Sequence, residues 1–287
     1  MLRGAQLALD RMVNPFKPSV AEVEKIQKEI EGTLLAEIFP TSFFASVKGQ
    51  AKAYEAKLSR DISDAYSILQ PPEQRTKLLE FLTLMKPKMS ASNWKHLCKR
   101  MRSDSRSQSL LGLFEVAITG NLLAQIPDNR VSLNIPTRGK KDADIGVVLD
   151  DRMVHLEITV LDESDQMKAR LPMRRSQKVS IWSSDVSEVN GSRQIDRITK
   201  KSKEFIKGHP NVLVIQVLNP LDWTEIARDA YLKHEFKNVG LILPFDRIEL
   251  EKDYVRETDD ACRLTEKERQ LLINLLSGDD FFPFGYV

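Results

Sequence analysis

The feature that most constrains this chain is a change in the spacing of its apolar residues near Ser105. Before that point, apolar residues recur every three or four positions, which is typical of amphipathic helices. Beyond residue 130, short segments alternate apolar and polar residues or run continuously apolar, which is typical of strands. The sequence therefore predicts a helical N-terminal region followed by an α/β region.

The N-terminal region predicts several helices separated by clear breaks. Pro40-Thr41-Ser42 and Pro71-Pro72-Glu73 interrupt the helical spacing and offer new helix starts. Ser90 or Ser92 can cap a short helix that runs through Cys98. No repeat of fixed period is present, which argues against a solenoid.

The second region predicts the order α-β-β-β-α-β-α-β. Its expected strands are RVSLNI, ADIGVVL, MVHLEITVL, NVLVIQVL and VGLILPF, and a last helix is expected over EKERQLLINLL. This order favours an α/β fold with a mixed central sheet flanked by helices. We expect a helical region over 1–104, a core over 105–250, and a C-terminal helix and tail over 251–287.

Charge and cysteine content limit the class of protein. The 43 Lys and Arg nearly balance the 41 Asp and Glu, so no global attraction to nucleic acid is expected. Locally, residues 165–210 carry eleven basic and five acidic residues, and a second basic cluster runs from Lys95 to Arg106; a solvated surface would explain either cluster. The two cysteines lie in no zinc-binding pattern, and no apolar run could span a bilayer. We therefore expect a cytoplasmic protein without a membrane partner.

Two of the expected strands carry acids on one face. Alternation places His155, Glu157 and Thr159 together in MVHLEITVL, and Asp144 on the corresponding face of the preceding strand. Two carboxylates that lie close together repel unless a cation sits between them. The pattern predicts that Asp144 and Glu157 hold a divalent cation such as Mg²⁺.

Glu115 is the third acid of interest, since it lies within the apolar helix LLGLFEVAITGNLL. This helix is expected to pack on the sheet, where an unpaired carboxylate would be costly. Glu115 either reaches solvent at the edge of the apolar stripe or joins the acidic cluster.

These residues resemble, in order and spacing, the PD-(D/E)xK nuclease superfamily with its restriction-endonuclease-like fold. The resemblance covers about half of the chain, roughly residues 105–245. It implies that Glu115 matches the acid of the family's helix, Ala143-Asp144 the PD position, and Glu157-Ile158-Thr159 the (D/E)xK triplet. The metal ligands would then be Asp144, Glu157, the Ile158 carbonyl and Glu115, and the metal Mg²⁺ or Mn²⁺.

The chain departs from the family where Thr159 replaces the lysine. A hydroxyl cannot supply the positive charge that helps to activate the attacking water. Another basic residue could replace it: the resemblance implies Lys201 on the following helix as first choice, and Lys140, which could share the Asp144 face if that strand starts early enough, is the second. His155 could move a proton or contact a phosphate, although a structural hydrogen bond would also explain it. The residues expected to contact nucleic acid are Arg193, Gln194, Arg197, Lys200 and Lys201.

The leading hypothesis is a metal-dependent nuclease that hydrolyses phosphodiester bonds in DNA. The N-terminal helices would then serve recognition, dimerisation or docking of a protein partner, and a homodimer would suit cleavage of both strands of a duplex. The first alternative is a catalytically degenerate member of the same fold that acts as a nucleic-acid-binding or protein-interaction scaffold. A second is an α/β protein with no nucleic-acid role, whose acids form ordinary salt bridges.

Overall fold

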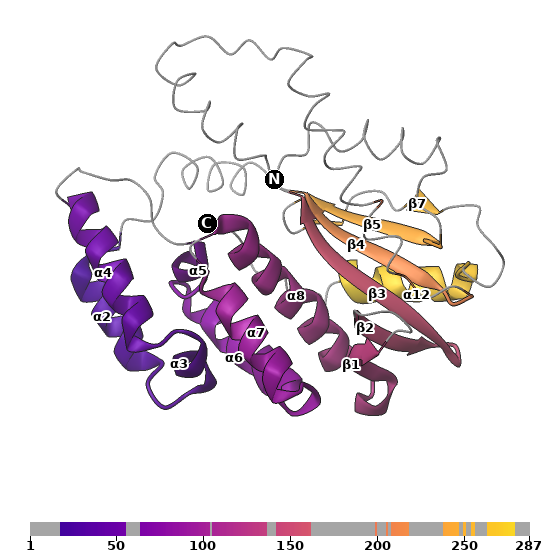
Figure 1. Cartoon of the computed structure of the whole chain (residues 1–287), viewed down its shortest axis with the longest axis horizontal. Coiled ribbons are helices and arrows are strands. Elements are labelled where there is room, and N and C mark those ends of the chain that lie inside the picture. The colour runs from indigo at the N-terminus through magenta and orange to yellow at the C-terminus, as the bar shows by residue number, and fades with distance from the viewer. Residues whose placement is uncertain are drawn as a thin grey trace, which may run out of the picture. The chain divides into compact units, whose positions relative to one another are not determined.

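The computed structural model describes residues 18–55, 64–103, 105–136, 142–161, 199, 205, 208–217, 238–246, 249–250, 254–255 and 263–278. The chain divides into two compact units at the Gln125–Ile126 bond. Figure 1 shows helices in the first unit and a sheet with a helix in the second. Among the described residues, no helix is long and apolar enough to cross a membrane.

The first unit contains the predicted helices, and their ends follow the expected signals. Its α-helices are α2 (Val20–Glu29), α3 (Leu34–Ile38), α4 (Thr41–Glu55), α5 (Asp64–Ser67), α6 (Pro72–Met85), α7 (Ala91–Met101) and α8 (Arg106–Gln125), with the 3₁₀ turn η1 (Lys86–Lys88) after α6. As predicted, Thr41 and Pro72 begin helices, and the Ser90 side chain caps α7. The apolar spacing continues through residues 19–39 and predicts a single helical segment. The segment forms two helices because the chain turns at Gly32, whose φ of 76° is left-handed.

Helix α8 is the central helix of this unit. It packs against α6 and α7, and most of its described side chains are buried. Two glycines permit this close packing: a Cβ on Gly112 would meet Met101 of α7, and a Cβ on Gly120 would overlap Phe81 of α6. The sequence assigned this helix to the nuclease core, whereas the compact units group it with the N-terminal helices. That it also packs on the sheet stays a prediction.

The second unit contains the mixed sheet, and its five longer strands match the five predicted segments. They are β1 (Val131–Pro136), β2 (Asp142–Leu149), β3 (Arg152–Leu161), β4 (Asn211–Val217) and β5 (Leu241–Asp246). The turn η2 (Asp128–Arg130) precedes them, and β6 (Glu249–Leu250) and β7 (Tyr254–Val255) each pair with β5. The order is β1-β2-β3-β4-β5-β6, antiparallel up to β3 and parallel from β3 to β5. The prediction of a mixed α/β fold is therefore confirmed.

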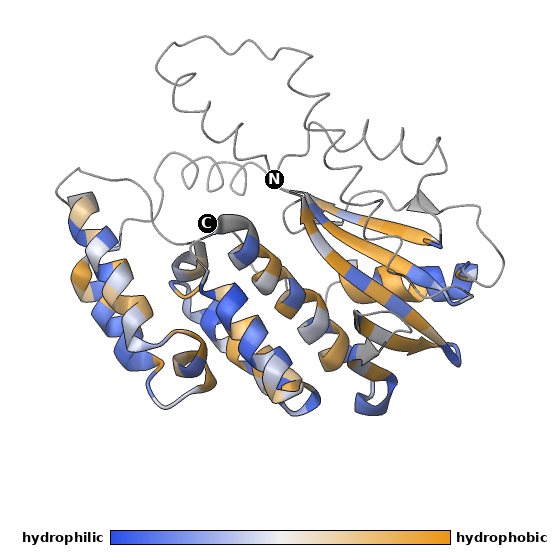
Figure 2. Cartoon of the chain, in the orientation of Figure 1, coloured by the Kyte–Doolittle hydropathy of each residue, from blue (hydrophilic) through white to orange (hydrophobic). Residues whose placement is uncertain are grey.

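Strands β4 and β5 form the most apolar part of the sheet, and Figure 2 shows them as nearly continuous apolar segments. Their described side chains are all buried, which is typical of strands in the parallel part of a sheet. The expected helices between β3 and β4 and between β4 and β5 lie outside the described residues, apart from Thr199 and Phe205.

Helix α12 (Glu266–Ser277), the predicted C-terminal helix, contacts β2 and β6. Its Glu268 is almost fully buried and receives two hydrogen bonds from Arg152 at the start of β3. The same carboxylate completes a capping box with Thr265. A single acid therefore both starts the helix and attaches it to the sheet.

Candidate active site

A tight hairpin brings the two predicted carboxylates into register. Strands β2 and β3 are joined by Asp150 and Asp151, with φ of 45° and 66°. Positive φ at both central residues is the type I′ geometry, whose twist matches that of the flanking strands. The register pairs Leu149 with Arg152 and runs to the pair Ile145–Leu156. One further step along this register places Asp144 beside Glu157.

The ladder between β2 and β3 changes at Asp144. The last paired residues are Ile145 and Leu156, and the next amide on this side of β3, that of Ile158, donates instead to Asp144 Oδ2 at 2.8 Å. On the other side of β2, the register of β1 places Asn134 opposite Asp144. The backbone of Asn134 is in the left-handed conformation, with a φ of 52°. The Asp144 carboxylate therefore lies between the two strands and takes the place of a backbone partner.

The backbone of Ile158 faces this carboxylate for a reason of strand geometry. The His155 amide donates to Pro210 at the start of β4, so residues of the opposite parity, including Ile158, direct their amides towards β2. In a strand, the carbonyl of a residue points to the same side as its amide. The predicted carbonyl ligand and the Asp144 side chain thus share one edge of β3.

Glu157 and Thr159 lie on the expected face of β3 and are both 3% exposed. They pair in parallel register with Leu213 and Ile215 of β4. A carboxylate withdrawn from water is costly unless other groups compensate its charge. A buried acid next to a part-exposed one is an arrangement that suits cation binding.

Glu115 forms an ion pair within the helical unit, and its predicted role as a metal ligand stays a prediction. It lies on α8 in the first unit, and Arg100 of α7 donates a charge-assisted hydrogen bond to its carboxylate. Among the described residues, no three His, Cys, Asp or Glu side chains converge in a group that could hold a metal ion. Asp144 and Glu157 lie on the paired strands β2 and β3 of the sheet unit, while Glu115 is paired within the helical unit.

The side chain of His155 on β3 is buried and contacts a second histidine. Its ring meets that of His209 edge-on at 5.2 Å between centroids. Burial lowers the pKa of His155 below its usual value of 6.5, and the nearby His209 lowers it further. Its Nδ1 has no hydrogen-bond partner among the described residues. A neutral imidazole on the face of Glu157 is compatible with the predicted proton transfer, which stays a prediction.

The remaining predicted residues lie outside the described part of the chain. They are the two candidate replacements for the missing lysine, Lys140 and Lys201, and the other expected nucleic-acid contacts Arg193, Gln194, Arg197 and Lys200. Thr159, which stands at the lysine position, is described and is buried. Within the described strands, the lysine position of the motif therefore offers a hydroxyl and no charge.

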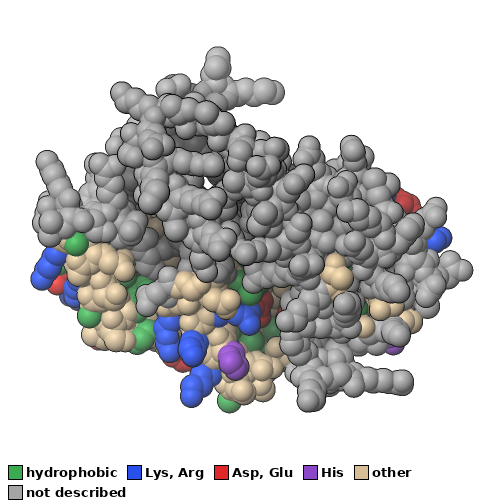
Figure 3. All heavy atoms as spheres, turned by 45° about the horizontal axis from the view of Figure 1, so that its top comes forward, with side chains coloured by type: hydrophobic (Ala, Val, Ile, Leu, Met, Phe, Trp, Pro, Cys, Tyr) green, Lys and Arg blue, Asp and Glu red, His purple; other side chains and the backbone are tan. Residues whose placement is uncertain are grey.

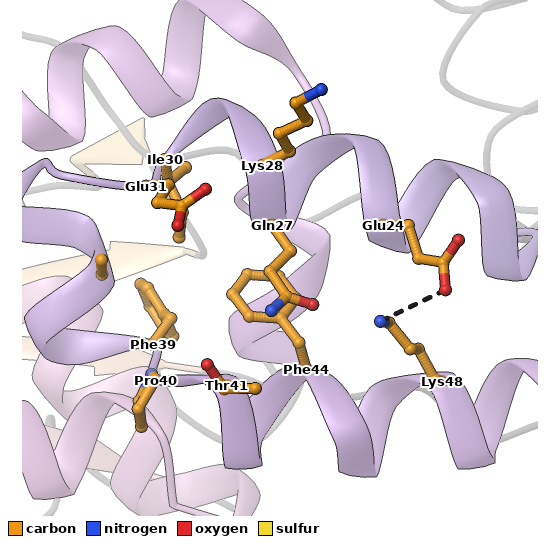
Figure 4. A pocket seen from close by; sticks show the side chains of 11 residues that line it. Glu24, Gln27, Lys28, Ile30, Glu31, Phe39, Pro40, Thr41, Phe44 and Lys48 are labelled. Atoms are coloured by element: carbon orange, nitrogen blue, oxygen red, sulfur yellow. Dashed lines mark ion pairs between the residues drawn. The ribbon is translucent and has the colours of Figure 1, made fainter.

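A pocket of about 430 Å³ opens in the helical unit, on helices α2 and α4. Figure 4 shows Gln27 and Phe44 among the residues that line it. It also shows an ion pair in which Lys48 Nζ lies 3.3 Å from Glu24 Oε1. None of the residues predicted for the nuclease site lines this pocket. Sequence reasoning missed it because its lining comes from separate helices, and amphipathic spacing does not show which helices face each other.

The donor set at the hairpin fits a hard divalent cation. Mg²⁺ is usually held by one or two carboxylates, with waters and substrate phosphates completing its shell. Asp144, Glu157 and the Ile158 carbonyl offer oxygen ligands alone, as such an ion requires. No family model, curated protein or solved structure matches this chain. The likeness to PD-(D/E)xK nucleases thus stays a prediction that rests on these residues.

Proposed function

We propose that this chain is a metal-dependent nuclease that hydrolyses phosphodiester bonds, with DNA as its substrate. One observation supports the proposal above the others. The Asp144 carboxylate replaces a backbone partner where β2 leaves β3, and it accepts from the Ile158 amide in the triplet that contains buried Glu157. A continued backbone ladder would need no charged group here, so the carboxylate at this position supports a role in binding a cation.

The proposed roles follow from the chemistry of each group. Asp144, Glu157 and the Ile158 carbonyl would hold Mg²⁺ or Mn²⁺. The bound ion would supply an activated water and neutralise charge on the scissile phosphate. The Ile158 amide holds one oxygen of Asp144 in place, and this fixes the direction of the other. A basic residue, Lys201 or Lys140, would supply the charge that Thr159 lacks.

One observation favours a second candidate function. Thr159 is buried and uncharged at the lysine position, which is what loss of catalysis would leave behind in this fold. The chain would then be a scaffold that binds nucleic acid or a protein partner. One experiment separates the two functions. A scaffold would still bind its partner after Glu157 is replaced, whereas a nuclease would no longer cleave DNA.

The test is a cleavage assay on plasmid and linear DNA with Mg²⁺ or Mn²⁺. Asp144→Asn and Glu157→Gln keep the size of each side chain and remove its charge. We expect each to lower the cleavage rate by at least about a hundredfold, since both remove a metal ligand. Asp151→Asn is the matched control, because this acid belongs to the same hairpin but its side chain is 94% exposed at the turn. Its rate should equal that of the wild type.

Two results would count against the nuclease. Either no product forms from any substrate with either metal, or the Glu157→Gln protein cleaves as fast as the wild type. Lys201→Gln and Lys140→Gln then identify the source of the missing charge. We expect Lys201→Gln to lose most of the cleavage activity and Lys140→Gln to retain it.

A further inference from the structure

An unusual run of charge lies in the helical unit, which does not include the predicted metal ligands of the hairpin. From Lys86 to Ser103 the chain has six Lys and Arg residues and no Asp or Glu. The run covers the turn η1 and the whole of α7. Charged surfaces of soluble proteins usually mix both signs. A one-sided stretch of this length therefore indicates a specific use.

The fold arranges these charges along one side of α7. Leu97, Cys98 and Met101 form its buried face. The helical spacing of Lys95, Lys99 and Arg102, at i, i+4 and i+7, places them together along one side of the helix, next to the buried face, over about 10 Å of helix axis. Lys95 and Lys99 are exposed, and Arg102 is half-buried at the C-cap. We call Lys95, Lys99 and Arg102 the α7 basic stripe.

Acids from other helices neutralise only the margins of this surface. Glu37 of α3 pairs with Lys86, and Glu115 of α8 pairs with Arg100. For the α7 basic stripe, no ion pair joins any of its three residues to an acid within the described parts of the chain; Arg102 donates only to the neutral Ile38 carbonyl. Figure 3 shows Lys and Arg side chains gathered beside a histidine on the described surface.

We propose that the α7 basic stripe binds the phosphate backbone of DNA. The choice of DNA rests on the proposed function, while the charge complementarity rests on the stripe itself. Lysines spaced along a straight helix suit a regular line of phosphates, and such contacts need no base readout. The stripe would hold the substrate from the helical unit, independently of the metal ligands.

The same surface is poorly suited to other anionic partners. Membrane-binding helices insert large apolar side chains beside their lysines. Among the described residues, the only exposed large hydrophobic side chain is Leu271, which is on α12 and not on α7. Protein interfaces are depleted of lysine at their centres and enriched in aromatic and apolar groups. Trp94, the aromatic residue of α7, hydrogen-bonds to Glu37.

The test compares two double variants of the full chain in binding to a fluorescein-labelled DNA duplex, with EDTA present to prevent cleavage. Lys95→Gln with Lys99→Gln removes two charges from the stripe. Lys25→Gln with Lys52→Gln is the control, because it removes two charges from exposed positions on α2 and α4. Anisotropy is measured over a range of salt concentrations, and circular dichroism verifies that each variant is folded.

We expect the stripe variant to bind at least about tenfold more weakly at low salt. Loss of two phosphate contacts should also reduce the slope of log K against log salt by about 1.8. The control variant should match the wild type, and Lys95→Arg with Lys99→Arg should bind as the wild type does. Equal affinity and slope for the stripe and control variants would overturn the proposal, as would binding to anionic lipid vesicles with none to DNA.

The outcome is separable from that of the cleavage assay. If DNA is bound through the stripe but never cut, the stripe stands and the nuclease fails. If the stripe variant binds and cuts DNA like the wild type, the nuclease stands and the stripe fails. Glu157→Gln should leave the salt slope unchanged, since that residue is not part of the stripe.

Discussion

Replacing Gly120 by alanine tests how closely α8 packs in the helical unit. A Cβ at this position would lie 2.1 Å from Cγ, 2.3 Å from Cδ2 and 2.5 Å from Cβ of Phe81. These atoms are at the base of a fully buried side chain, so a rotation of the ring cannot move them away. The two helices would have to separate, or Phe81 would have to leave its site.

Two opposing effects determine the magnitude. Alanine within a helix is favoured over glycine by about 0.5–1 kcal/mol, because glycine loses more conformational entropy on folding. Overpacking a close-packed core costs about 1–3 kcal/mol or more, and an overlap of this size belongs at the upper end. We therefore expect Gly120→Ala to lower the free energy of unfolding by about 2 kcal/mol.

The measurement is urea unfolding followed by circular dichroism at the helical wavelength. Gly49→Ala on α4 is the matched control, since a Cβ there meets no atom within 4 Å. That variant should be more stable than the wild type by about 0.5–1 kcal/mol. Phe81→Leu should recover part of the loss when combined with Gly120→Ala. The packing argument is wrong if the two glycine variants have the same stability.

Four further predictions concern the sheet unit. Arg152→Met leaves the buried Glu268 carboxylate without its guanidinium partner and should lower the free energy of unfolding by about 2–3 kcal/mol. This is below the usual cost of breaking a buried ion pair, because Thr265 still donates to the same carboxylate. An unchanged midpoint of urea unfolding would contradict this. Asp151→Gly should raise stability by about 0.5–1 kcal/mol, since its φ of 66° strains any residue with a Cβ, and a lower melting temperature would oppose that reasoning. Burial and His209 lower the pKa of His155 in the folded protein, so the imidazole takes up a proton more readily in the unfolded chain. The free energy of unfolding should therefore fall as the pH drops below 6.5. His155→Gln should remove that part of the pH dependence. Burial would raise the pKa of Glu268, but hydrogen bonds from Arg152 and Thr265 outweigh this effect, and the pKa is lowered. A second loss of stability should therefore begin below pH 4.5. It should be absent in Glu268→Gln.

The sheet could be predicted from the sequence because its signals are local. Alternation along MVHLEITVL and ADIGVVL determines which side chains share a face, and the structure places Asp144 and Glu157 on neighbouring strands as expected. The continuously apolar strands β4 and β5 follow from their composition, because both of their faces are buried. Helix starts at Thr41 and Pro72 were equally local, since proline and capping residues act within one turn.

The partners of the acids could not be predicted because they depend on tertiary contacts. Glu115 was expected to escape to solvent or to join the acidic cluster, and Arg100 on a neighbouring helix pairs with it instead. Arg152 and Glu268 are 116 positions apart and nothing in their local sequence connects them. The break at Gly32 was missed because the apolar spacing continues on both sides of the glycine.

The two-residue turn at Asp150-Asp151 has a consequence for how the proposed site is assembled. Asp144 and Glu157 are only 13 positions apart in the chain, whereas β3 and its parallel neighbour β4 are separated by about 50 residues. Closing a short loop costs little entropy and takes microseconds, but parallel pairing must wait for a long connection to close. The strands that carry the two acids are therefore expected to pair before the parallel half of the sheet does.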